Sequence, residues 1–349
     1  MIKGDNAIYI RVDGGPEIGA GHIVRCVSIA KEIEKKGIPA VFVSSNVDAL
    51  QILSDYGYRP ILVGGDPKHL VKGDAKKLKE VMVEGKRVLV DSYGVTDEFF
   101  VSCKELGLQV IYIDDLYTFE LGGLKRPVRW ELEAVINYSF GVRKEDYQKV
   151  YSDSSTKLLI GPQYAPVREV FKEKAASYQV RDEVKKVLIT TGSTNPNKSL
   201  EKLACACRTA LPEVSISIVV GNAASFDSSL KEELNVSLIK GATDLSDYML
   251  DSDLVISAAG TTLYELCTLG VPTIAVPVVE NQLLNVFGFI DAGLGFATNK
   301  LDWDVDEFEA LLREFTNIPE GLQRFNRAMR LKSIGDGVDL IASNLAVFF

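Results

Sequence analysis

Short apolar runs alternate with amphipathic segments along the 349-residue chain, and this rhythm constrains the fold more than any other feature. Near-continuous apolar runs that end in polar or glycine-rich turns are typical of parallel strands with helices on both faces of the sheet. The first half has the expected strands Ala7–Val12, Ala40–Ser44, Arg59–Val63, Val88–Asp91 and Gln109–Asp114, and the expected helices Gly21–Lys36, Ala49–Tyr56, Asp74–Glu84 and Thr96–Glu105. This half is therefore predicted to be a doubly wound α/β domain.

The second half repeats the rhythm. It has the expected strands Lys186–Thr190, Ser215–Val220, Val236–Ile239, Leu254–Ser257 and Thr273–Val276, and the expected helices Asn197–Ala210, Leu245–Leu250 and Thr262–Leu269. Single hydrophobic cores stop growing at about 250–300 residues, so a chain of this length is expected to form two domains. We predict two facing Rossmann-like domains, residues 1–165 and 176–349, joined by a stretch that contains the charged helix Val167–Lys174. The last helix is a candidate for packing back toward the N-terminal domain.

Composition narrows the class of protein. An apolar fraction of 46% is typical of a folded globular chain, and a formal net charge of -9 argues against a nucleic-acid partner. The five cysteines form neither a disulfide framework nor a zinc pattern, so they are expected to be reduced core thiols. Residues 1–10 lead into a strand without signal-peptide features, and no apolar run approaches the ~18–20 residues of a membrane span. We expect a soluble, cytoplasmic protein without a membrane partner.

The first turn is rich in glycine and leads into a helix that carries a histidine. Gly19 and Gly21 allow a ligand to approach the backbone, and the free N–H groups of a helix start favour an anion or a sugar. The dinucleotide fingerprint lacks its third glycine, because Val24 stands there, so no nicotinamide or flavin cofactor is expected. His22, at this helix start, is a candidate general base. The alternative is that His22 is a partly buried structural residue whose ring nitrogens are hydrogen-bonded within the protein. His69 is expected to be a solvated loop residue.

Carboxylates follow two neighbouring strands of the predicted first sheet. Asp91 ends one strand, and Asp114 and Asp115 follow the next. Adjacent carboxylates suggest metal binding, but successive side chains diverge and no third ligand lies at a useful spacing, so no metal is expected. The simpler interpretation is that Asp91 and Asp114 cap turns and orient their neighbours.

A small-residue turn in the second half precedes another helix start. Gly260, Thr261 and Thr262 offer N–H groups and hydroxyls that suit a diphosphate, and Glu265, about one turn into the helix, suits two ribose hydroxyls. The alternative is a plain helix cap, with a threonine as N-cap and Glu265 at the third helical position. The residues alone leave both interpretations open.

Together these motifs resemble the UDP-sugar-binding lobe of the glycosyltransferase B superfamily, and more closely the UDP-2,4-diacetamido-2,4,6-trideoxy-β-L-altropyranose hydrolases of pseudaminic acid biosynthesis and their spore-coat polysaccharide relatives. The resemblance is carried by Arg11-Val-Asp13, Ile18-Gly-Ala-Gly-His22-Ile-Val-Arg25, Asp91-Ser-Tyr93-Gly94, Ile113-Asp114-Asp115, Asn137-Tyr138, residues 161–171 and Glu280-Asn281-Gln282. The segments run in family order across nearly the whole chain. The element Gly-x-Gly-His-x-x-Arg is the most specific of them.

The resemblance implies a hydrolase that cleaves the glycosidic C–O bond of a UDP-linked diacetamido sugar with inversion and without a metal. His22 matches the base that activates water, and Tyr93, also assigned to catalysis, and Asn281 match residues near the sugar. Arg168 and the helix at Thr261 match diphosphate contacts, and Glu265 the ribose acceptor. The remaining expected substrate-binding residues are Asp13, Gly19, Gly21, Arg25, Gly192, Gly260, Thr262 and Gln282.

One loop departs from the family pattern. After the strand Lys186–Thr190 the family usually has Gly-Gly-Ser-Asp-Pro, and this chain has Gly192-Ser193-Thr194-Asn195-Pro196. Two alternatives to the hydrolase remain. A glycosyltransferase of the same architecture would normally show an apolar and basic patch on the N-terminal domain, which the sequence lacks, and the presence of His22 disfavours a binding protein without catalysis.

Overall fold

The computed structural model describes residues 7–15, 18–83, 85–115, 131–221, 223–332 and 334–349. It divides into two compact units. Unit 1 contains Met1–Tyr138, Val142–Pro166 and Asp336–Phe349, and unit 2 contains Ser139–Gly141 and Val167–Gly335. No single cut in the sequence produces these units. The segment Ser139–Gly141 lies within the sequence of unit 1 but belongs to unit 2, and the last helix follows unit 2 in the sequence but belongs to unit 1. The division into functional domains at 1–165 and 176–349 stays a prediction.

Unit 1 is built on a seven-stranded sheet in the order β3-β2-β1-β4-β5-β6-β7, with every described pair parallel. The strands are β1 Ile8–Val12, β2 Ala40–Ser44, β3 Ile61–Leu62, β4 Arg87–Asp91, β5 Gln109–Ile113, β6 Ala134–Asn137 and β7 Lys157–Ile160. The helices are α1 Gly21–Lys35, α2 Asp48–Asp55, α3 Lys72–Val81, α4 Asp97–Glu105, α5 Lys144–Val150 and α14 Gly337–Ala346, with a 3-10 turn at Pro162–Tyr164. All residues of β1 and β6 are buried, as expected of parallel strands covered on both faces.

Unit 2 contains a six-stranded parallel sheet in the order β10-β9-β8-β11-β12-β13. Its strands are β8 Lys186–Thr190, β9 Ser215–Val220, β10 Val236–Lys240, β11 Leu254–Ala258, β12 Thr273–Val276 and β13 Phe296–Ala297. Its helices are α6 Glu169–Lys174, α7 Ser199–Ala210, α8 Ser228–Glu233, α9 Ser246–Leu250, α10 Thr261–Leu269, α11 Leu283–Asp291, α12 Val305–Thr316 and α13 Gly321–Leu331. The predicted fold class, two Rossmann-like α/β domains, is therefore confirmed.

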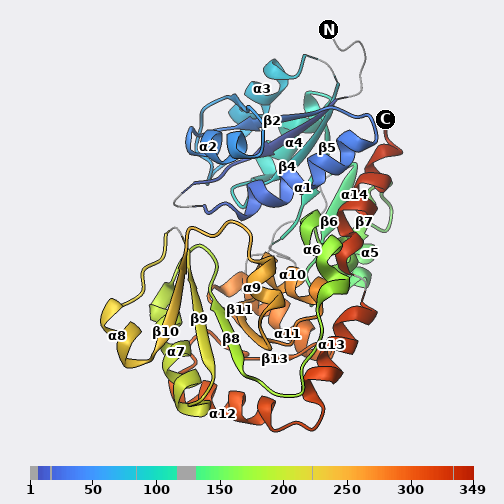
Figure 1. The fold of residues 1–349 in the computed structure, drawn as a ribbon. Coiled ribbons are helices and arrows are strands. Elements are labelled where there is room, and N and C mark those ends of the chain that lie inside the picture. The colour runs from blue at the N-terminus through green and yellow to red at the C-terminus, as the bar shows by residue number, and fades with distance from the viewer. Residues whose placement is uncertain (1–6, 16–17, 84, 116–130, 222, 333) are drawn as a thin grey trace. The chain divides into compact units, whose positions relative to one another are not determined.

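The last helix of the chain, α14, completes the core of unit 1. Val338, Ile341 and Leu345 form a stripe at helical spacing, and all three are buried. The helix packs on α1, and Figure 1 shows the two side by side in red and blue. At its start, Gly337 approaches the backbone of Ala165 so closely that a Cβ atom would lie 1.9 Å from the Ala165 oxygen. A side chain larger than hydrogen therefore has no room at this position.

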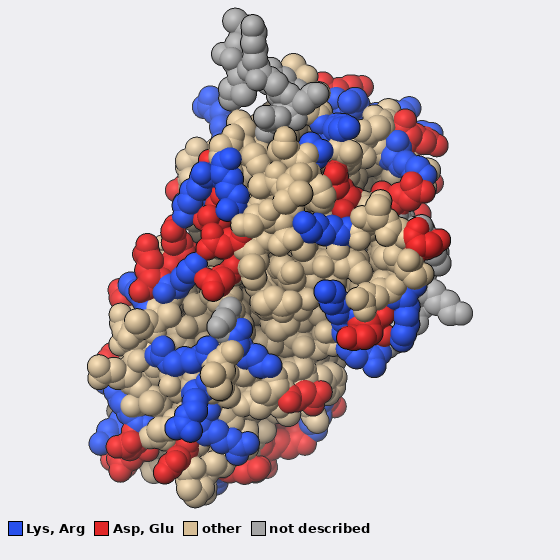
Figure 2. Space-filling view, turned by 90° about the vertical axis from the view of Figure 1, so that its right-hand side faces the viewer, with Lys and Arg blue, Asp and Glu red and all other residues tan. Residues whose placement is uncertain are grey.

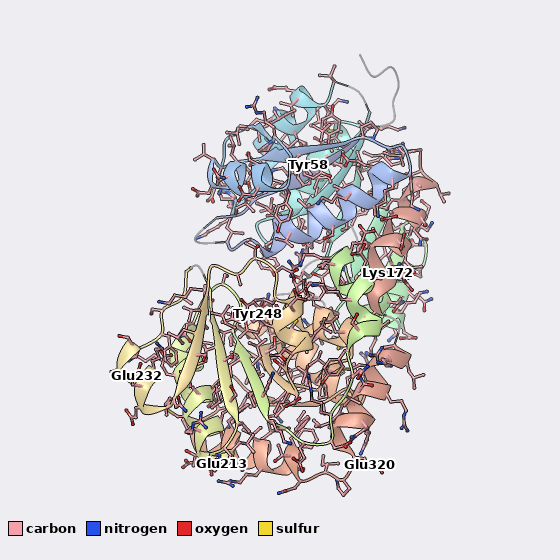
Figure 3. All side chains as sticks on the ribbon, viewed as in Figure 1. Tyr58, Lys172, Glu213, Glu232, Tyr248 and Glu320 are labelled. Atoms are coloured by element: carbon pink, nitrogen blue, oxygen red, sulfur yellow. The ribbon has the colours of Figure 1, made fainter. Side chains whose placement is uncertain are left out.

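Local contacts join successive βα units. Tyr58, labelled in Figure 3, follows α2 and donates a hydrogen bond to Glu34 Oε2 of α1 at 2.7 Å. Its ring lies 4.7 Å from the ring of Phe42 in β2. Burial and the Glu34 carboxylate raise the pKa of Tyr58 above its ordinary range, so the phenol stays neutral. One side chain thus ties a connecting loop both to a helix and to the sheet.

The surface shown in Figure 2 carries charged side chains of both signs, with wide areas of other residues between them. The formal net charge of -9 is thus accompanied by basic side chains on the same face. Among the helices that the structure describes, none is both long enough and apolar enough to cross a membrane.

Candidate functional site

The strand order of unit 1 reverses between β1 and β4, and the predicted catalytic residues gather there. In doubly wound sheets, ligands bind outside the carboxyl ends of the strands at such a reversal. Asp91 is the last residue of β4, and Tyr93 lies in the turn that follows. His22 occupies the first turn of α1, the helix that follows β1. The topology therefore brings together residues about seventy positions apart in the sequence.

His22 is held by a buried carboxylate. Its Nδ1 lies 2.7 Å from Asp91 Oδ1, and both residues are buried. Arg25 Nη2 lies 2.9 Å from the same nitrogen and donates to Asp91 Oδ1 at 2.5 Å. His22 and Arg25 are three residues apart in α1, so both side chains lie on the same helix face.

The chemistry of these three groups assigns the histidine tautomer. A guanidinium only donates hydrogen bonds and a carboxylate only accepts them. If Nδ1 accepted from Arg25, its lone pair would face the Asp91 oxygen at 2.7 Å, which is repulsive. With the proton on Nδ1, His22 donates to Asp91 and Nε2 keeps its lone pair. A neutral ring in this tautomer is ready to accept a proton at Nε2.

Arg25 binds both Asp91, at the end of β4, and Asp115, in the turn after β5. It binds Asp91 through both Nε, at 2.6 Å from Oδ2, and Nη2, and its Nη1 donates to Asp115 Oδ2 at 2.8 Å and to the hydroxyl of Tyr138. Burial alone would raise the pKa of Asp91, but Arg25 and His22 outweigh it and hold that pKa well below its ordinary value. The pKa of Asp115 is lowered in the same way by Arg25 and by the Tyr93 hydroxyl. Both carboxylates are therefore ionised at neutral pH.

Tyr93 completes this group of residues. Its hydroxyl donates to Asp115 Oδ2 at 2.7 Å, and its ring meets the His22 ring edge-on, with 4.5 Å between ring centroids. Burial and the charge of Asp115 raise the pKa of Tyr93 far above its ordinary value. The phenol is thus neutral, and its proton is directed at Asp115 rather than at a ligand.

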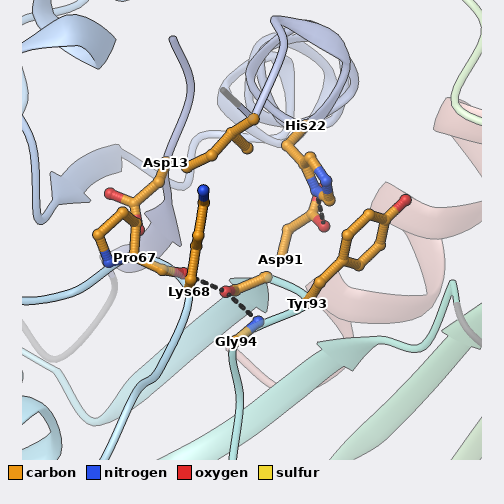
Figure 4. A pocket seen from close by; sticks show the side chains of 9 residues that line it. Asp13, His22, Pro67, Lys68, Asp91, Tyr93 and Gly94 are labelled. Atoms are coloured by element: carbon orange, nitrogen blue, oxygen red, sulfur yellow. Dashed lines mark hydrogen bonds and ion pairs between the residues drawn. The ribbon is translucent and has the colours of Figure 1, made fainter. Parts of the chain in front are cut away.

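A pocket of about 320 Å³ opens beside these residues. Figure 4 shows His22, Asp91 and Tyr93 on one side of it and Asp13, Pro67 and Lys68 on the other. Ile18, Ser92 and Gly94 complete the lining. The predicted base, its carboxylate partner and Tyr93 therefore share one cavity in unit 1.

Asp13 lines this pocket, but its carboxylate is engaged within the protein. Its oxygens accept bonds from Arg11 Nη1, Ser44 Oγ and the Ser45 backbone N–H, each at 2.7 Å. Arg11 also donates to the Ser45 hydroxyl. This buried group fixes the carboxyl ends of β1 and β2. The role of Asp13 in substrate binding stays a prediction.

The glycines of the first turn shape the entry into α1. Gly15 and Gly19 pair with each other across the turn, and both have positive φ angles, of 136° and 84°. Such angles disfavour other residues. Gly21 is the first residue of α1, and a Cβ atom there would meet nothing within 4 Å. Pro16 and Glu17, between these glycines, lie outside the described residues.

The wall of the pocket opposite His22 is formed by the loop 66–70, which is fastened to the turn after β4. Leu70 N donates to Gly94 O at 2.7 Å, and a Cβ atom at Gly94 would lie 2.5 Å from the Lys68 carbonyl carbon and 2.6 Å from Pro67 O. The absence of a side chain at Gly94 therefore permits this close contact. His69, in the same loop, is exposed.

In unit 2 the strand order reverses between β8 and β11. Gly192 follows β8, and Gly260, Thr261 and Thr262 follow β11. Helix α10 begins at Thr261 with Gly260 as its N-cap residue, and no side chain caps it. The alternative interpretation, a threonine N-cap paired with Glu265, is therefore wrong. The half-buried Thr261 and Thr262 stand in the first turn of the helix, where backbone N–H groups lack partners within the helix.

Glu265 and Arg168 form an ion pair. Arg168 Nε donates to Glu265 Oε1 at 2.8 Å, and its Nη1 donates to Thr243 O at 2.9 Å. Glu265 is 5% exposed, and burial raises its pKa although Arg168 acts in the opposite direction. The two residues expected to contact different parts of a nucleotide are thus partners in this structure.

The stretch Glu280–Gln282 folds against the β11–α10 turn. It is a single 3-10 turn, in which Gln282 Oε1 accepts from Val278 N at 3.0 Å, while its Nε2 lies 3.5 Å from the place of a Cβ atom at Gly260. Asn285 Nδ2 donates to Ala259 O at 2.9 Å and fastens α11 to the same turn. Asn281 lies between these contacts in the sequence and is half-buried.

The loop that departs from the family pattern is anchored by Asn195. Its Oδ1 accepts from Leu200 N at 2.9 Å, and its Nδ2 donates to Glu201 Oε2 at 2.7 Å and to Ser225 O at 2.8 Å. Gly192 has a φ of 83° and approaches Gly221 so closely that a Cβ atom there would lie 2.2 Å from Gly192 O. The amide of Asn195 thus serves a buried carboxylate, which an aspartate at this position could not do.

Sequence reasoning missed the importance of two carboxylates. Asp91 orients His22, as one interpretation suggested, but it caps no turn through the bonds described here, and Asp115 was considered only as a metal ligand. Asp114 accepts a hydrogen bond from the Tyr147 hydroxyl at 2.6 Å. Leu116, which follows this pair, lies outside the described residues. One indication of their importance was present in the sequence, because Asp91 and Asp115 lie at the carboxyl ends of two neighbouring strands.

The other chemical expectations concern cysteine and metals. All five cysteines are free, and four of them are buried. Among the described residues, no group of three or more His, Cys, Asp or Glu side chains is arranged to hold a metal ion.

Residues 186–341 match the family model of the glycosyltransferase family 28 C-terminal domain. The chain is 24% identical over 293 residues to the uncharacterized protein MJ1062 of Methanocaldococcus jannaschii, a match that covers 79% of this chain and 56% of the relative, so it spans little more than half of that protein. It is 23% identical over 297 residues to the spore coat polysaccharide biosynthesis protein SpsG of Bacillus subtilis, covering 82% of this chain and 81% of the relative.

Solved structures share the fold over nearly the whole chain. MurG of Acinetobacter baumannii has a TM-score of 0.63 at 16% identity, with 96% of this chain and 98% of that chain covered. MnaA of S. aureus in its UDP co-structure has a TM-score of 0.64 at 12% identity, with 98% and 96% covered. The chain therefore has the glycosyltransferase B fold, and its residues 186–341, most of unit 2 and the start of α14, match the model of the glycosyltransferase family 28 C-terminal domain.

Proposed function

We propose that the protein hydrolyses a UDP-linked amino sugar of the 2,4-diacetamido-2,4,6-trideoxyhexose class to UDP and the free sugar. The observation that carries the proposal is the 2.7 Å contact between His22 Nδ1 and Asp91, which leaves Nε2 as a base at a pocket. SpsG, a relative over most of its length, is a spore coat polysaccharide biosynthesis protein, and MnaA was solved with UDP. The sugar class follows from the resemblance of the sequence motifs.

In the proposed reaction His22 Nε2 takes a proton from water as the water oxygen attacks the anomeric carbon. The bond between that carbon and the UDP oxygen breaks, and UDP leaves with both bonding electrons. The water attacks from the face opposite UDP, so the configuration inverts. Asp91 stabilises the imidazolium that forms, as the acid of a Ser-His-Asp triad does. Tyr93, whose hydroxyl donates a hydrogen bond to Asp115, lies beside the base.

Unit 2 supplies the groups proposed for the nucleotide. The start of α10 offers N–H groups and the two threonine hydroxyls to a diphosphate, whose charge it stabilises through the helix dipole. We propose that Glu265, buried and paired with Arg168, accepts hydrogen bonds from the ribose hydroxyls. These assignments predict that nucleotide affinity depends on unit 2 and the rate of bond cleavage on unit 1.

The test is to incubate the purified protein with UDP-diacetamido sugars in EDTA and ¹⁸O-water and to follow UDP and free sugar by NMR and mass spectrometry. Hydrolysis at the glycosidic C–O bond places ¹⁸O on the anomeric carbon and none on UDP. His22→Asn should abolish turnover while UDP affinity stays nearly unchanged. His69→Asn is the matched control, because His69 is an exposed loop histidine of the same unit, and its turnover should be unchanged. ¹⁸O on UDP, or equal losses of rate and of UDP affinity in the His22 variant, would refute the proposal.

A glycosyltransferase is the second candidate, because residues 186–341 match a glycosyltransferase domain model. In that case His22 would take the proton of an acceptor hydroxyl instead of water. The same assay separates the two functions. Release of UDP only after an acceptor is added, with the sugar recovered on that acceptor, would establish the transferase and reject the hydrolase.

A further inference from the structure

The Tyr93 side chain is more exposed than its neighbours in the site, yet it holds a fixed place against His22. It lies in a turn and is 43% exposed, so core packing alone does not restrain its ring. Its hydroxyl is held at 2.7 Å by Asp115 Oδ2, and its ring is in edge contact with His22. The hydrogen bond to Asp115 therefore helps to hold the Tyr93 ring beside His22, the proposed base.

Asp115 itself is restrained by Arg25. The oxygen that accepts from Tyr93 also accepts from Arg25 Nη1 at 2.8 Å. Arg25 cannot move away, because its Nε and Nη2 bind both oxygens of Asp91. A guanidinium bound in this bidentate way has a fixed orientation.

Five side chains form a closed cycle of contacts. His22 contacts Asp91, Asp91 binds Arg25, Arg25 binds Asp115, Asp115 holds Tyr93, and the Tyr93 ring returns to His22. The two carboxylates have different partners in this set of contacts. Asp91 holds Nδ1 of the His22 ring, and Asp115 holds the Tyr93 side chain whose ring contacts His22. Asp91 and Asp115 therefore have different roles in the site.

We propose that Asp115 is a positioning residue, which acts on the base indirectly by holding the Tyr93 ring against His22. The inference rests on the proposed function for its consequence in catalysis, but its structural content stands independently. Loss of the acceptor oxygen of Asp115 removes the hydrogen bond that holds the Tyr93 hydroxyl, and the contact between the Tyr93 ring and the imidazole changes. Asp115 does not touch His22 in this account and takes no proton from it.

The first test needs no substrate. The chain has two histidines, and His69→Gln leaves His22 as the only source of imidazole NMR signals. In that background Tyr93→Leu removes the ring current felt by the His22 ring protons and shifts their signals. Asp115→Ala, which removes the acceptor oxygen, should shift the same signals in the same direction. Asp55→Asn, a change at an exposed site on α2, is the control and should leave them in place.

The double variant decides whether Asp115 acts through Tyr93. Asp115→Ala should add no further shift in the Tyr93→Leu background, because residues that act through a common partner are not additive. An equal shift with and without Tyr93 would show that Asp115 acts on His22 through Arg25 alone and would overturn the proposal. Unchanged His22 signals in Asp115→Ala would overturn it too. Thermal unfolding of each variant establishes that it is folded.

The second test measures turnover. Asp115→Ala and Tyr93→Phe should each lower kcat about 10- to 100-fold with little change in KM, and the double variant should be no slower than the slower single variant. Multiplied losses in the double variant would contradict the positioning role. If the wild-type protein releases no UDP, the proposed function fails, whereas the NMR experiment still decides the role of Asp115.

Discussion

At the scale of single residues, the chemistry of unit 1 depends on two carboxylates that Arg25 keeps ionised. Asp91 is nearly fully buried, and without Arg25 and His22 its pKa would rise rather than fall. The same carboxylate sets the tautomer of His22 by accepting the proton on Nδ1. A buried ion pair of this kind contributes orientation to the site, whereas its contribution to stability is reduced by the desolvation of both charges.

Asp91→Asn is predicted to lower kcat by about 10²- to 10⁴-fold, because an amide no longer fixes the Nδ1–H tautomer or stabilises the imidazolium. The dissociation constant of UDP should stay nearly unchanged, since the proposed nucleotide groups belong to unit 2. Steady-state kinetics and calorimetric titration with UDP measure the two quantities. A rate within twofold of wild type would show that Asp91 does not orient the base.

The sequence predicted part of this site and missed the rest for a physical reason. His22 and Arg25 were found because the motif Gly-x-Gly-His-x-x-Arg is specific and places both residues on one helix face. Asp91 and Asp115 look like ordinary turn residues in the sequence. Their role depends on the order of the strands, since β1, β4 and β5 lie side by side only after the sheet has formed.

At the scale of elements, the strand–turn–helix units were predictable and their junctions were not. The periodicity identified five of the strands in unit 1, but the prediction stopped before β6 and β7, which extend the sheet by two further strands. It extended β3 to Arg59–Val63, whereas the strand consists of Ile61 and Leu62. The contact between loop 66–70 and Gly94 has no signal in the sequence, because it depends on the approach of two turns in space.

Gly94→Ala is predicted to destabilise the protein by about 1–3 kcal/mol, because the new methyl group meets backbone atoms of the loop 66–70 that cannot rotate away. The displaced loop should also raise KM, since Pro67 and Lys68 line the pocket. Urea unfolding and steady-state kinetics measure these effects. Gly73→Ala, in helix α3 with open space around it, is the control and should be neutral or stabilising. Equal stabilities of the two variants would refute the packing argument.

Asn195→Asp should destabilise the start of α7 by about 1–3 kcal/mol, because it replaces the amide that donates to the buried Glu201 with a carboxylate. The acceptor for Leu200 N is kept, so the losses are the contact with Glu201 and the hydrogen bond to Ser225 O. Glu201→Gln should recover the part of the stability that belongs to the Glu201 contact in the Asn195→Asp background, because it restores one donor. Chemical denaturation measures each step, and failure of the second change to restore stability would contradict this account.

At the scale of the whole molecule, the two Rossmann-like units were predictable from the repeated rhythm of strands and helices, and the last helix was a candidate for packing back toward the N-terminal domain, whereas the bounds of the two units were not predictable. The periodicity of a helix shows which face is buried and does not show against which unit it is buried. Helix α14 follows the whole of unit 2 in the sequence, yet it belongs to unit 1 and packs on α1. Unit 1 is therefore assembled from segments on both sides of unit 2 in the sequence.

This path predicts that a fragment of residues 1–166 is much less stable than the same fragment joined by a flexible linker to residues 336–349. The buried side chains of Val338, Ile341 and Leu345 are absent from the shorter fragment, and burial of three such side chains stabilises by roughly 5–9 kcal/mol. Because domains are stable by only about 5–15 kcal/mol, the loss is comparable to the whole stability of the unit.

Thermal unfolding followed by circular dichroism tests this prediction. The fused fragment should show a cooperative transition, and the fragment of residues 1–166 should show none or a strongly lowered midpoint. A third fragment with Ile341→Asp in the fused helix separates packing from chain length, since it has the same residues in number but cannot bury its helix face on α1 without burying a charge. It should behave like the shorter fragment. If residues 1–166 unfold as cooperatively and at the same temperature as the fusion, α14 does not belong to the core that stabilises unit 1.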